Sequence, residues 1–251
     1  MPMSVIDEIM KIESAGWINS QINELPDRGK FRASSALRSL QWANGIFDAG
    51  MPIPACFCAL HATEEAVAAF ISCAKECGYD EAKNINIMDH AAKATVSLLA
   101  QKVSGILLHY KVAVALDTKT QTLATRYIVD GQTHYNEVST KLFHYRDDKD
   151  NALPDFYDEL VKMFGDVNEL KKAVKVGQEA RNTIFYASSK GYPTGFDDPS
   201  ESLARECQLT LGLIWGAIDL TRNADQKIPF IEQALQTANI VIDELTKRER
   251  R

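Results

Sequence analysis

Apolar side chains recur every three or four residues along most of the chain, the spacing that places them on one face of an α-helix. Prolines, glycines and short polar runs interrupt this spacing and divide it into separate helices. Pro26 to Gly29 forms one such turn, Gly50 and Pro52 form another, and Gly78 is suited to cap a helix end. The pattern predicts helices over residues 5–22, 31–48, 52–77, 81–108, 154–164, 167–188, 199–222 and 226–248.

One segment departs from the helical pattern. Between Lys111 and Val138, the stretches VAVAL and TLATRYIV are rich in β-branched residues and flank a polar run at residues 117–121. This arrangement predicts a β-hairpin inserted in the bundle, with a charged, solvated loop at residues 144–151. Short connections predict that the second, third and fourth helices are antiparallel neighbours. The expected fold class is therefore mainly α, an antiparallel helical bundle with an inserted β-hairpin.

Composition favours a soluble, cytoplasmic protein that folds as a single helical domain. Of the 251 residues, 45% are hydrophobic and 25% are charged, which is ordinary for a globular core. We expect one domain over residues 1–251, with its core at about 31–108 and 167–248 and the inserted hairpin and loop at about 111–151. The N-terminus lacks the basic and apolar regions of a signal peptide, and no uninterrupted apolar stretch reaches the length of a membrane span.

The charge balance bears on the choice of partner. The formal net charge is −6, which gives no general attraction to nucleic-acid phosphates or to anionic membranes. A local basic patch can still bind RNA, so the total charge excludes only attraction by the protein as a whole.

Three charged residues fall on apolar helix faces, where a solvated charge is not expected. At 100° per residue, Glu64 lies in the middle of the apolar face of helix 52–77. Asp89 lies inside the border of the stripe on helix 81–108, and Arg181 lies within the stripe on helix 167–188. A buried unpaired charge is costly. We therefore expect these residues to meet one another or to line a cleft between their helices.

Four further polar residues surround these charges. His61 and Glu65 lie at the edge of the face that carries Glu64, and Lys93 follows Asp89 by one turn. The same helical wheel predicts that His90 points away. Residue types alone leave two interpretations open, a structural ion-pair network that fixes helix register and a functional pocket.

Metal, cofactor and nucleophile motifs are weak in this chain. A di-metal carboxylate bundle uses Glu-x-x-His on two helices, whereas here the order is His-x-x-Glu, from His61 to Glu64, and it occurs once. Cys73 and Cys77 are one turn apart but lack a second pair, so the five cysteines are interpreted as reduced, mostly buried thiols. No glycine-rich nucleotide loop and no Gly-x-Ser-x-Gly turn is present. We expect neither a metal nor a cofactor.

A polar row near the end of helix 167–188 suggests phosphate chemistry. Asn182 and Tyr186 lie on one helical row, with Arg181 about 100° round the axis. An arginine can stabilise the charge of a phosphorane-like transition state, and a polar row beside it can position the reacting hydroxyl.

Three segments, taken together and in this order, resemble the AbiV-type abortive-infection family of the HEPN superfamily of helical bundles. They are ALRSLQWANGIFDAGMPIPACFCALHATEEAVAAF, NINIMDHAAKA and EARNTIFYASSKGYPTG, and they lie between about Ala33 and Gly195. The Asp89-His90 pair with Lys93 matches the family pattern better than the residues after Glu64-Glu65 do. Two motifs differ from the family pattern: Ala66-Val67 follows Glu64-Glu65 where Gly-Lys is usual, and Tyr186 stands where an Arg-Asn-x-x-x-His-like motif has histidine.

The resemblance implies an antiviral effector that acts on RNA or through a protein partner. HEPN proteins are often metal-independent endoribonucleases whose sites are built across a homodimer. By this resemblance, Arg181 would stabilise the phosphate, Asn182 would position it, and Tyr186 with His90 would handle the scissile hydroxyl. The supporting cluster would be formed by His61, Glu64, Glu65, Asp89 and Lys93.

A second function stays open beside the nuclease. A tyrosine is a poor proton shuttle near pH 7, so Tyr186 favours a non-catalytic helical interaction or regulatory module of a defence system. In that case the polar cluster would set the register of the bundle or hold a protein partner.

Overall fold

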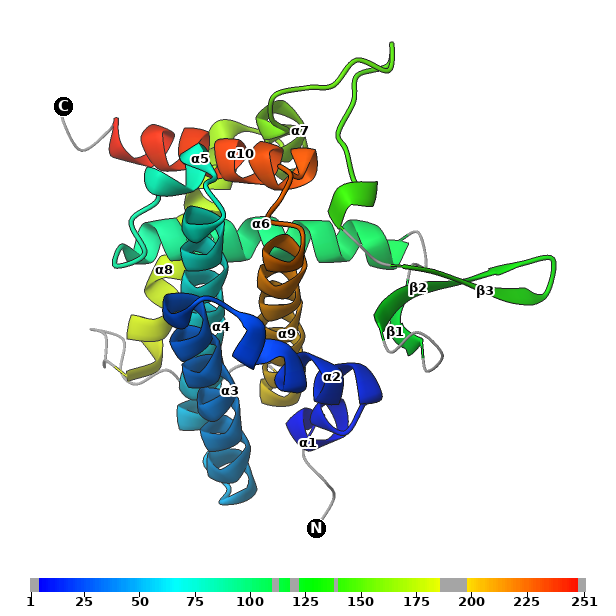
Figure 1. Ribbon diagram of the computed structural model, residues 1–251. Coiled ribbons are helices and arrows are strands. Elements are labelled where there is room, and N and C mark those ends of the chain that lie inside the picture. The colour runs from blue at the N-terminus through cyan, green and yellow to red at the C-terminus, as the bar shows by residue number, and fades with distance from the viewer. Residues whose placement is uncertain (1–4, 110–112, 118–121, 138–139, 186–197, 248–251) are drawn as a thin grey trace.

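A computed structural model of the chain describes residues 5–109, 113–117, 122–137, 140–185 and 198–247. Within this part the protein is mainly helical, as predicted, and carries a small antiparallel sheet (Figure 1). The division into a single domain stays a prediction. The helices are α1 (Val5–Met10), α2 (Glu13–Gln21), η1 (Ile22–Glu24), α3 (Asp27–Asp48), α4 (Pro52–Glu76), α5 (Asp80–Lys83), α6 (His90–His109), η2 (Thr140–Leu142), α7 (Tyr157–Phe164), α8 (Val167–Phe185), α9 (Pro199–Arg222) and α10 (Pro229–Thr246).

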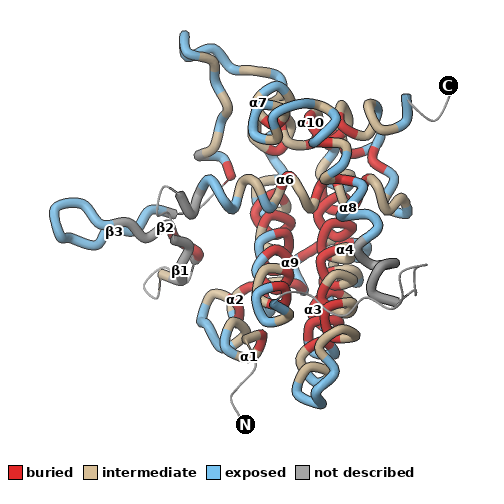
Figure 2. The backbone as a smooth tube through the Cα atoms, turned by 180° about the vertical axis from the view of Figure 1, so that it is seen from behind, coloured by how far each residue is buried: buried red, intermediate tan, exposed pale blue. Residues whose placement is uncertain are grey.

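Helix α4 is the central element of the bundle. It packs against α3 on one side and α9 on the other, and buried residues line both α4 and α9 (Figure 2). In the described residues, α4 is the one helix long and apolar enough to cross a membrane by length and composition. Its most apolar window is 67% buried inside the protein, as expected of a core helix.

The α3–α4 pair forms largely as predicted, with a different start. Helix α3 begins at Asp27, directly after Pro26, so Gly29 lies inside the helix and not in a turn. At Gly29 the two helices come so close that an added Cβ would lie 2.2 Å from Cys73 Sγ. The end of α4 follows the prediction: Gly78 has φ +77°, and the Tyr79 N–H donates to the Ala74 carbonyl oxygen over 2.9 Å.

The first predicted helix is wrong as a single element. The chain bends at Ile12, whose backbone is extended, and forms the two short helices α1 and α2. The bend lets Ile6 on α1 and Ile18 on α2 both be buried, with both helices packed on α9. An unbroken helix has the same spacing of apolar residues, so periodicity did not reveal the bend.

The predicted helix over residues 81–108 is also interrupted. It consists of α5 (Asp80–Lys83) and α6 (His90–His109), joined by residues 84–89. This connection redirects the chain, and α6 lies across α4 and α9 instead of beside them (Figure 1). The prediction of three antiparallel neighbours therefore holds for α3 and α4, whereas α6 crosses α4.

The predicted β-hairpin is present and is extended by one strand. β1 (Ala113–Asp117) pairs with β2 (Thr122–Val129), and β2 pairs with β3 (Gln132–Glu137), both antiparallel. Asp130 and Gly131 have φ angles of 50° and 75°, as a tight type I′ turn requires. Leu123 of β2 is buried and the neighbouring strand β1 packs on α2, while the far end of β2 and β3 projects outward (Figure 2).

Side chains of α9 and α10 fasten the segment between the sheet and α7. The Thr140 backbone N–H donates to Asp219 Oδ2 on α9 over 2.8 Å. Gln233 on α10 accepts from the Tyr145 N–H over 2.9 Å and donates to the carbonyl oxygens of Tyr145 and Leu153. The predicted loop at 144–151 is mostly exposed, with this clamp at its base.

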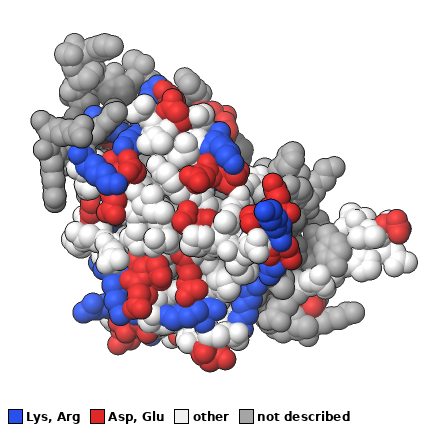
Figure 3. All heavy atoms as spheres, turned by 90° about the horizontal axis from the view of Figure 1, so that it is seen from above, with Lys and Arg blue, Asp and Glu red and all other residues white. Residues whose placement is uncertain are grey.

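Charged residues of both signs are interspersed on the end of the molecule where α5, α7 and α10 lie. Figure 3 views this end from above and shows acidic and basic side chains side by side among uncharged ones. This face carries no extended region of a single charge sign among the described residues.

Candidate functional site

Glu64, His90 and Lys93 meet between α4 and α6, and we call them the polar cluster. Glu64 Oε1 lies 3.2 Å from His90 Nδ1, and Glu64 Oε2 lies 3.7 Å from Lys93 Nζ. His90 and Lys93 are three residues apart on α6, which places them on the same side of that helix. Glu64 thus connects helix α4 with helix α6.

Burial within the polar cluster increases from His90 to Lys93. The side chain of His90 is 41% exposed, that of Glu64 is 19% exposed and that of Lys93 is 9% exposed. A buried amine needs a nearby carboxylate to offset the loss of its hydration, and Glu64 supplies it. The same carboxylate reaches His90 at the solvent boundary, so Glu64 links a buried cation to an accessible imidazole.

Two predictions about the start of α6 are corrected. Asp89 does not face the core: its Oδ1 accepts a hydrogen bond from the Ala91 N–H over 2.9 Å, at the N-terminus of the helix. His90 does not point away, because it contacts Glu64. Both predictions assumed a continuous helix, and the irregular connection at residues 84–89 changes the direction of every side chain that follows.

Glu65 and His61 lie on α4 beside the polar cluster, but neither takes part in its contacts between Glu64, His90 and Lys93. Glu65 Oε1 lies 3.4 Å from Arg32 Nη1 of α3, a partner that the sequence did not suggest. His61 is half-buried on α4 and has neither a hydrogen bond nor an ion pair with the described part of the chain. Of the five residues predicted as a supporting cluster, Glu64 and Lys93 are brought into direct contact.

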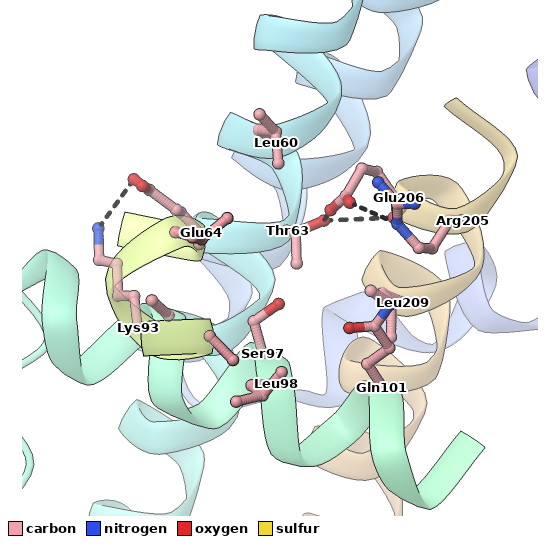
Figure 4. A pocket seen from close by; sticks show the side chains of 14 residues that line it. Leu60, Thr63, Glu64, Lys93, Ser97, Leu98, Gln101, Arg205, Glu206 and Leu209 are labelled. Atoms are coloured by element: carbon pink, nitrogen blue, oxygen red, sulfur yellow. Dashed lines mark hydrogen bonds and ion pairs between the residues drawn. The ribbon is translucent and has the colours of Figure 1, made fainter. Parts of the chain in front are cut away.

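A half-open cavity of about 270 Å³ lies next to the polar cluster, between α4, α6, α8 and α9 (Figure 4). Glu64 and Lys93 line one side of it, and a second carboxylate, Glu206, lies on the opposite side. Polar side chains of α6 and apolar side chains of all four helices complete the wall. The lining comprises Leu60, Thr63, Glu64, Lys93, Ala94, Ser97, Leu98, Gln101, Ala173, Val176, Gly177, Arg205, Glu206 and Leu209.

Glu206 is a buried carboxyl group that the sequence reasoning missed. Thr63 Oγ1 donates to its Oε2 over 2.7 Å, and Arg205 Nε donates to its Oε1 over 3.2 Å. Burial raises the pKa of the Glu206 carboxyl, and the contacts with Thr63 and Arg205 lower it only in part. A signal was present, because Glu206 lies between Leu203 and Thr210 on the apolar face of its helix, as Glu64 does on its own.

The residues of the Arg-Asn motif are only partly described. Arg181 and Asn182 lie in the backbone of α8, whose side chains are described as far as Glu179, and Tyr186 lies outside the described residues. Helix α8 packs on both α4 and α6. Gly177 lines the cavity, and a Cβ at that position would lie 3.7 Å from Ala94 Cβ of α6. Arg181 follows Gly177 by one helical turn.

Among the described residues, the side chains favour neither a metal site nor a thiol nucleophile. No three histidine, cysteine, aspartate or glutamate side chains among them are grouped so as to hold a metal ion. Cys73 is free and buried, and burial raises its pKa to about 12. A thiol with a raised pKa is a poor nucleophile at neutral pH.

His90 provides the clearest opportunity for proton transfer. Imidazole is the side chain that ordinarily exchanges protons near neutral pH, and a carboxylate on one ring nitrogen fixes its orientation and tautomer. Because Glu64 contacts Nδ1, the opposite nitrogen Nε2 is left to act on a ligand at the solvent boundary.

Comparisons of the chain with protein-family models, with curated proteins and with solved structures find no match.

Proposed function

We propose that this chain is an AbiV-like antiviral effector of the HEPN type that cleaves RNA without a metal ion. The observation that carries the proposal is the contact between Glu64 and His90, at the junction where α8 packs on α4 and α6. It adds an accessible imidazole beside the helix that carries Arg181, in a chain whose motif has Tyr186 in the place of histidine.

The roles of the residues follow from their chemistry. Arg181 stabilises the charge on the phosphate in the transition state, and Asn182 positions that phosphate. His90 accepts the proton of the attacking hydroxyl as its oxygen bonds to phosphorus, and gives that proton to the leaving oxygen as the other P–O bond breaks, with Tyr186 as a second hydrogen-bonding group. Glu64 is a positioning residue that holds the imidazole and does not touch the substrate.

The proposal includes a homodimer and a cytoplasmic location. The family resemblance supports the dimer, since HEPN sites combine the motifs of two subunits. Neither a cofactor nor a membrane has a role in the proposed reaction.

A second function, a non-catalytic interaction module, has its own supporting observation. Lys93 is the most buried member of the polar cluster and is paired with Glu64, which is the arrangement expected of an ion pair that fixes the packing of two helices. In this alternative the cluster stabilises the bundle, and the protein acts by holding a protein partner.

RNA cleavage in EDTA separates the two functions. Wild type, Arg181→Ala and His90→Gln are each incubated with total RNA, with Arg146→Ala as a control that removes an exposed arginine from the 144–151 loop. We expect the wild type and the control to cut RNA and the other two variants to lose most of that activity.

RNA profiles that do not differ between the wild type and a folded Arg181→Ala variant would remove the nuclease function. A protein that still restricts phage growth under those circumstances would act through a partner.

A further inference from the structure

The outer face of α3 combines exposed aromatic and basic side chains, and we call it the α3 stripe. Phe31 is 67% exposed and Trp42 is 53% exposed. They are eleven residues apart, close to three full helical turns, so they share one face. Arg38 lies between them with its guanidinium carbon 5.4 Å from the centroid of the Trp42 ring. Arg28 is exposed one turn before Phe31.

The α3 stripe is basic within an acidic protein. Between Asp27 and Asp48 at its two ends, helix α3 contains Arg28, Lys30, Arg32 and Arg38 and no further aspartate or glutamate, although the whole chain has a formal charge of −6. The end of the molecule seen in Figure 3 differs, because acidic and basic side chains alternate there. Arg28 and Arg38 therefore place two exposed positive charges beside the aromatic side chains, where they can attract an anionic ligand.

The α3 stripe leads toward the polar cluster. Arg32 lies at its edge and pairs with Glu65 of α4. The preceding residue, Glu64, contacts His90. Arg32 thus connects the edge of the stripe to the turn of α4 that also carries Glu64.

We propose that the α3 stripe binds single-stranded RNA. Bases stack on Phe31 and Trp42, and the phosphates meet Arg28 and Arg38, the combination of aromatic and cationic groups that suits single strands. The inference rests on the proposed function and specifies how its substrate is held. A second copy of the chain fits the stripe less well, because a symmetric contact would bring the same arginines against one another.

Fluorescence anisotropy with a labelled single-stranded RNA of about ten nucleotides tests the proposal. All variants are made in the Arg181→Ala background and measured in EDTA, so that cleavage does not interfere. Phe31→Ala and Trp42→Ala are each expected to raise Kd about tenfold or more. Arg28→Gln and Arg38→Gln are expected to raise Kd and to lower the salt dependence by about 0.7 per lost phosphate contact.

Matched controls lie elsewhere on the surface. Met163→Ala removes an apolar side chain that is 49% exposed on α7, and Lys149→Gln removes an exposed charge from the 144–151 loop. Both are expected to leave Kd within about twofold of the background value, a change of less than about 0.5 kcal/mol. All four α3 positions are exposed, and thermal melts establish that each variant is folded.

An unchanged RNA Kd in the α3 variants would overturn the proposal. The proposal would also be overturned if the α3 variants kept their RNA affinity and lost binding to vesicles of anionic lipid. The same holds if the α3 variants changed only the sedimentation coefficient of the protein. The two proposals fail separately. Binding that depends on α3, in a protein that does not cut RNA, contradicts only the nuclease function, whereas Arg181-dependent cleavage with normal binding by the α3 variants contradicts only this inference.

Discussion

The residue at which α6 begins determines what His90 contacts. Asp89 accepts the hydrogen bond from the Ala91 N–H and so fixes the first turn of the helix. His90 and Lys93 then point to the same side and share the carboxylate of Glu64. Shifting the start of the helix by one residue would rotate both side chains by about 100° and separate them from Glu64.

Glu206 predicts a dependence of stability on pH. Because its pKa is raised in the folded protein, the folded state binds this proton more tightly than the unfolded state does. The free energy of unfolding therefore falls as pH rises from the ordinary glutamate pKa, near 4.5, through the higher pKa of the folded protein. Glu206→Gln lacks this loss, and its stability relative to the wild type should therefore grow between pH 4 and pH 8.

Urea denaturation at a series of pH values measures this difference. Glu76→Gln, which changes an exposed glutamate at the end of α4, is the matched control and should show a smaller change with pH. The difference in the free energy of unfolding between Glu206→Gln and the wild type could instead stay constant or shrink as pH rises. That result would contradict a raised pKa of Glu206 in the folded protein.

At the scale of elements, the close approach of α3 and α4 depends on a glycine. Gly29→Ala would place a methyl group against Cys73 Sγ, and the free energy of unfolding should fall by about 1–3 kcal/mol. Gly45, on the same helix, has nothing within 4 Å of an added Cβ, so Gly45→Ala should stabilise by up to about 1 kcal/mol. Thermal denaturation compares the two.

The double variant Gly29→Ala/Cys73→Ala identifies the cause of the loss. Removing the sulfur makes room for the new methyl group, so the cost of Gly29→Ala should largely disappear in the Cys73→Ala background. An equal cost in both backgrounds would mean that contact with Cys73 is not the reason.

The hydrogen bonds from Gln233 of α10 to the base of the 144–151 loop are a second feature at the scale of elements. Gln233 is 3% exposed and bonds the backbones of both Tyr145 and Leu153. Gln233→Ala should lower the free energy of unfolding by about 2 kcal/mol and speed proteolysis within residues 146–151. Gln236→Ala, three residues along the same helix, is the control. Unchanged proteolysis in Gln233→Ala would mean that the loop holds its shape without the clamp.

The sequence predicts long elements well and their interruptions poorly. Helices α4 and α9 begin and end close to the predicted residues, because proline at the start and glycine or a polar turn at the end mark them. The breaks at Ile12 and at residues 84–89 carry no such mark, since the apolar spacing continues across them. The third strand is marked in the sequence by Asp130-Gly131, a pair that favours a tight turn between two strands.

At the scale of the whole molecule, the candidate site joins elements that are far apart in the sequence. Glu64 of α4, Lys93 of α6 and Glu206 of α9 line one cavity that α8 borders, and His90 of α6 contacts Glu64 beside it. The sequence could predict that Glu64 is buried on an apolar face. It could not predict its partners, because these depend on how α6 crosses α4.

The two carboxyl groups of the cavity allow the most direct test of the account. Glu64→Gln and Glu206→Gln make the same chemical change on opposite sides of the cavity, and RNA cleavage in EDTA is compared between them. If Glu64 holds His90 for catalysis, Glu64→Gln should lower kcat by about tenfold or more, with little change in KM, while Glu206→Gln stays close to the wild type. Equal activity in the two variants, or no cleavage by the wild type, would contradict the account.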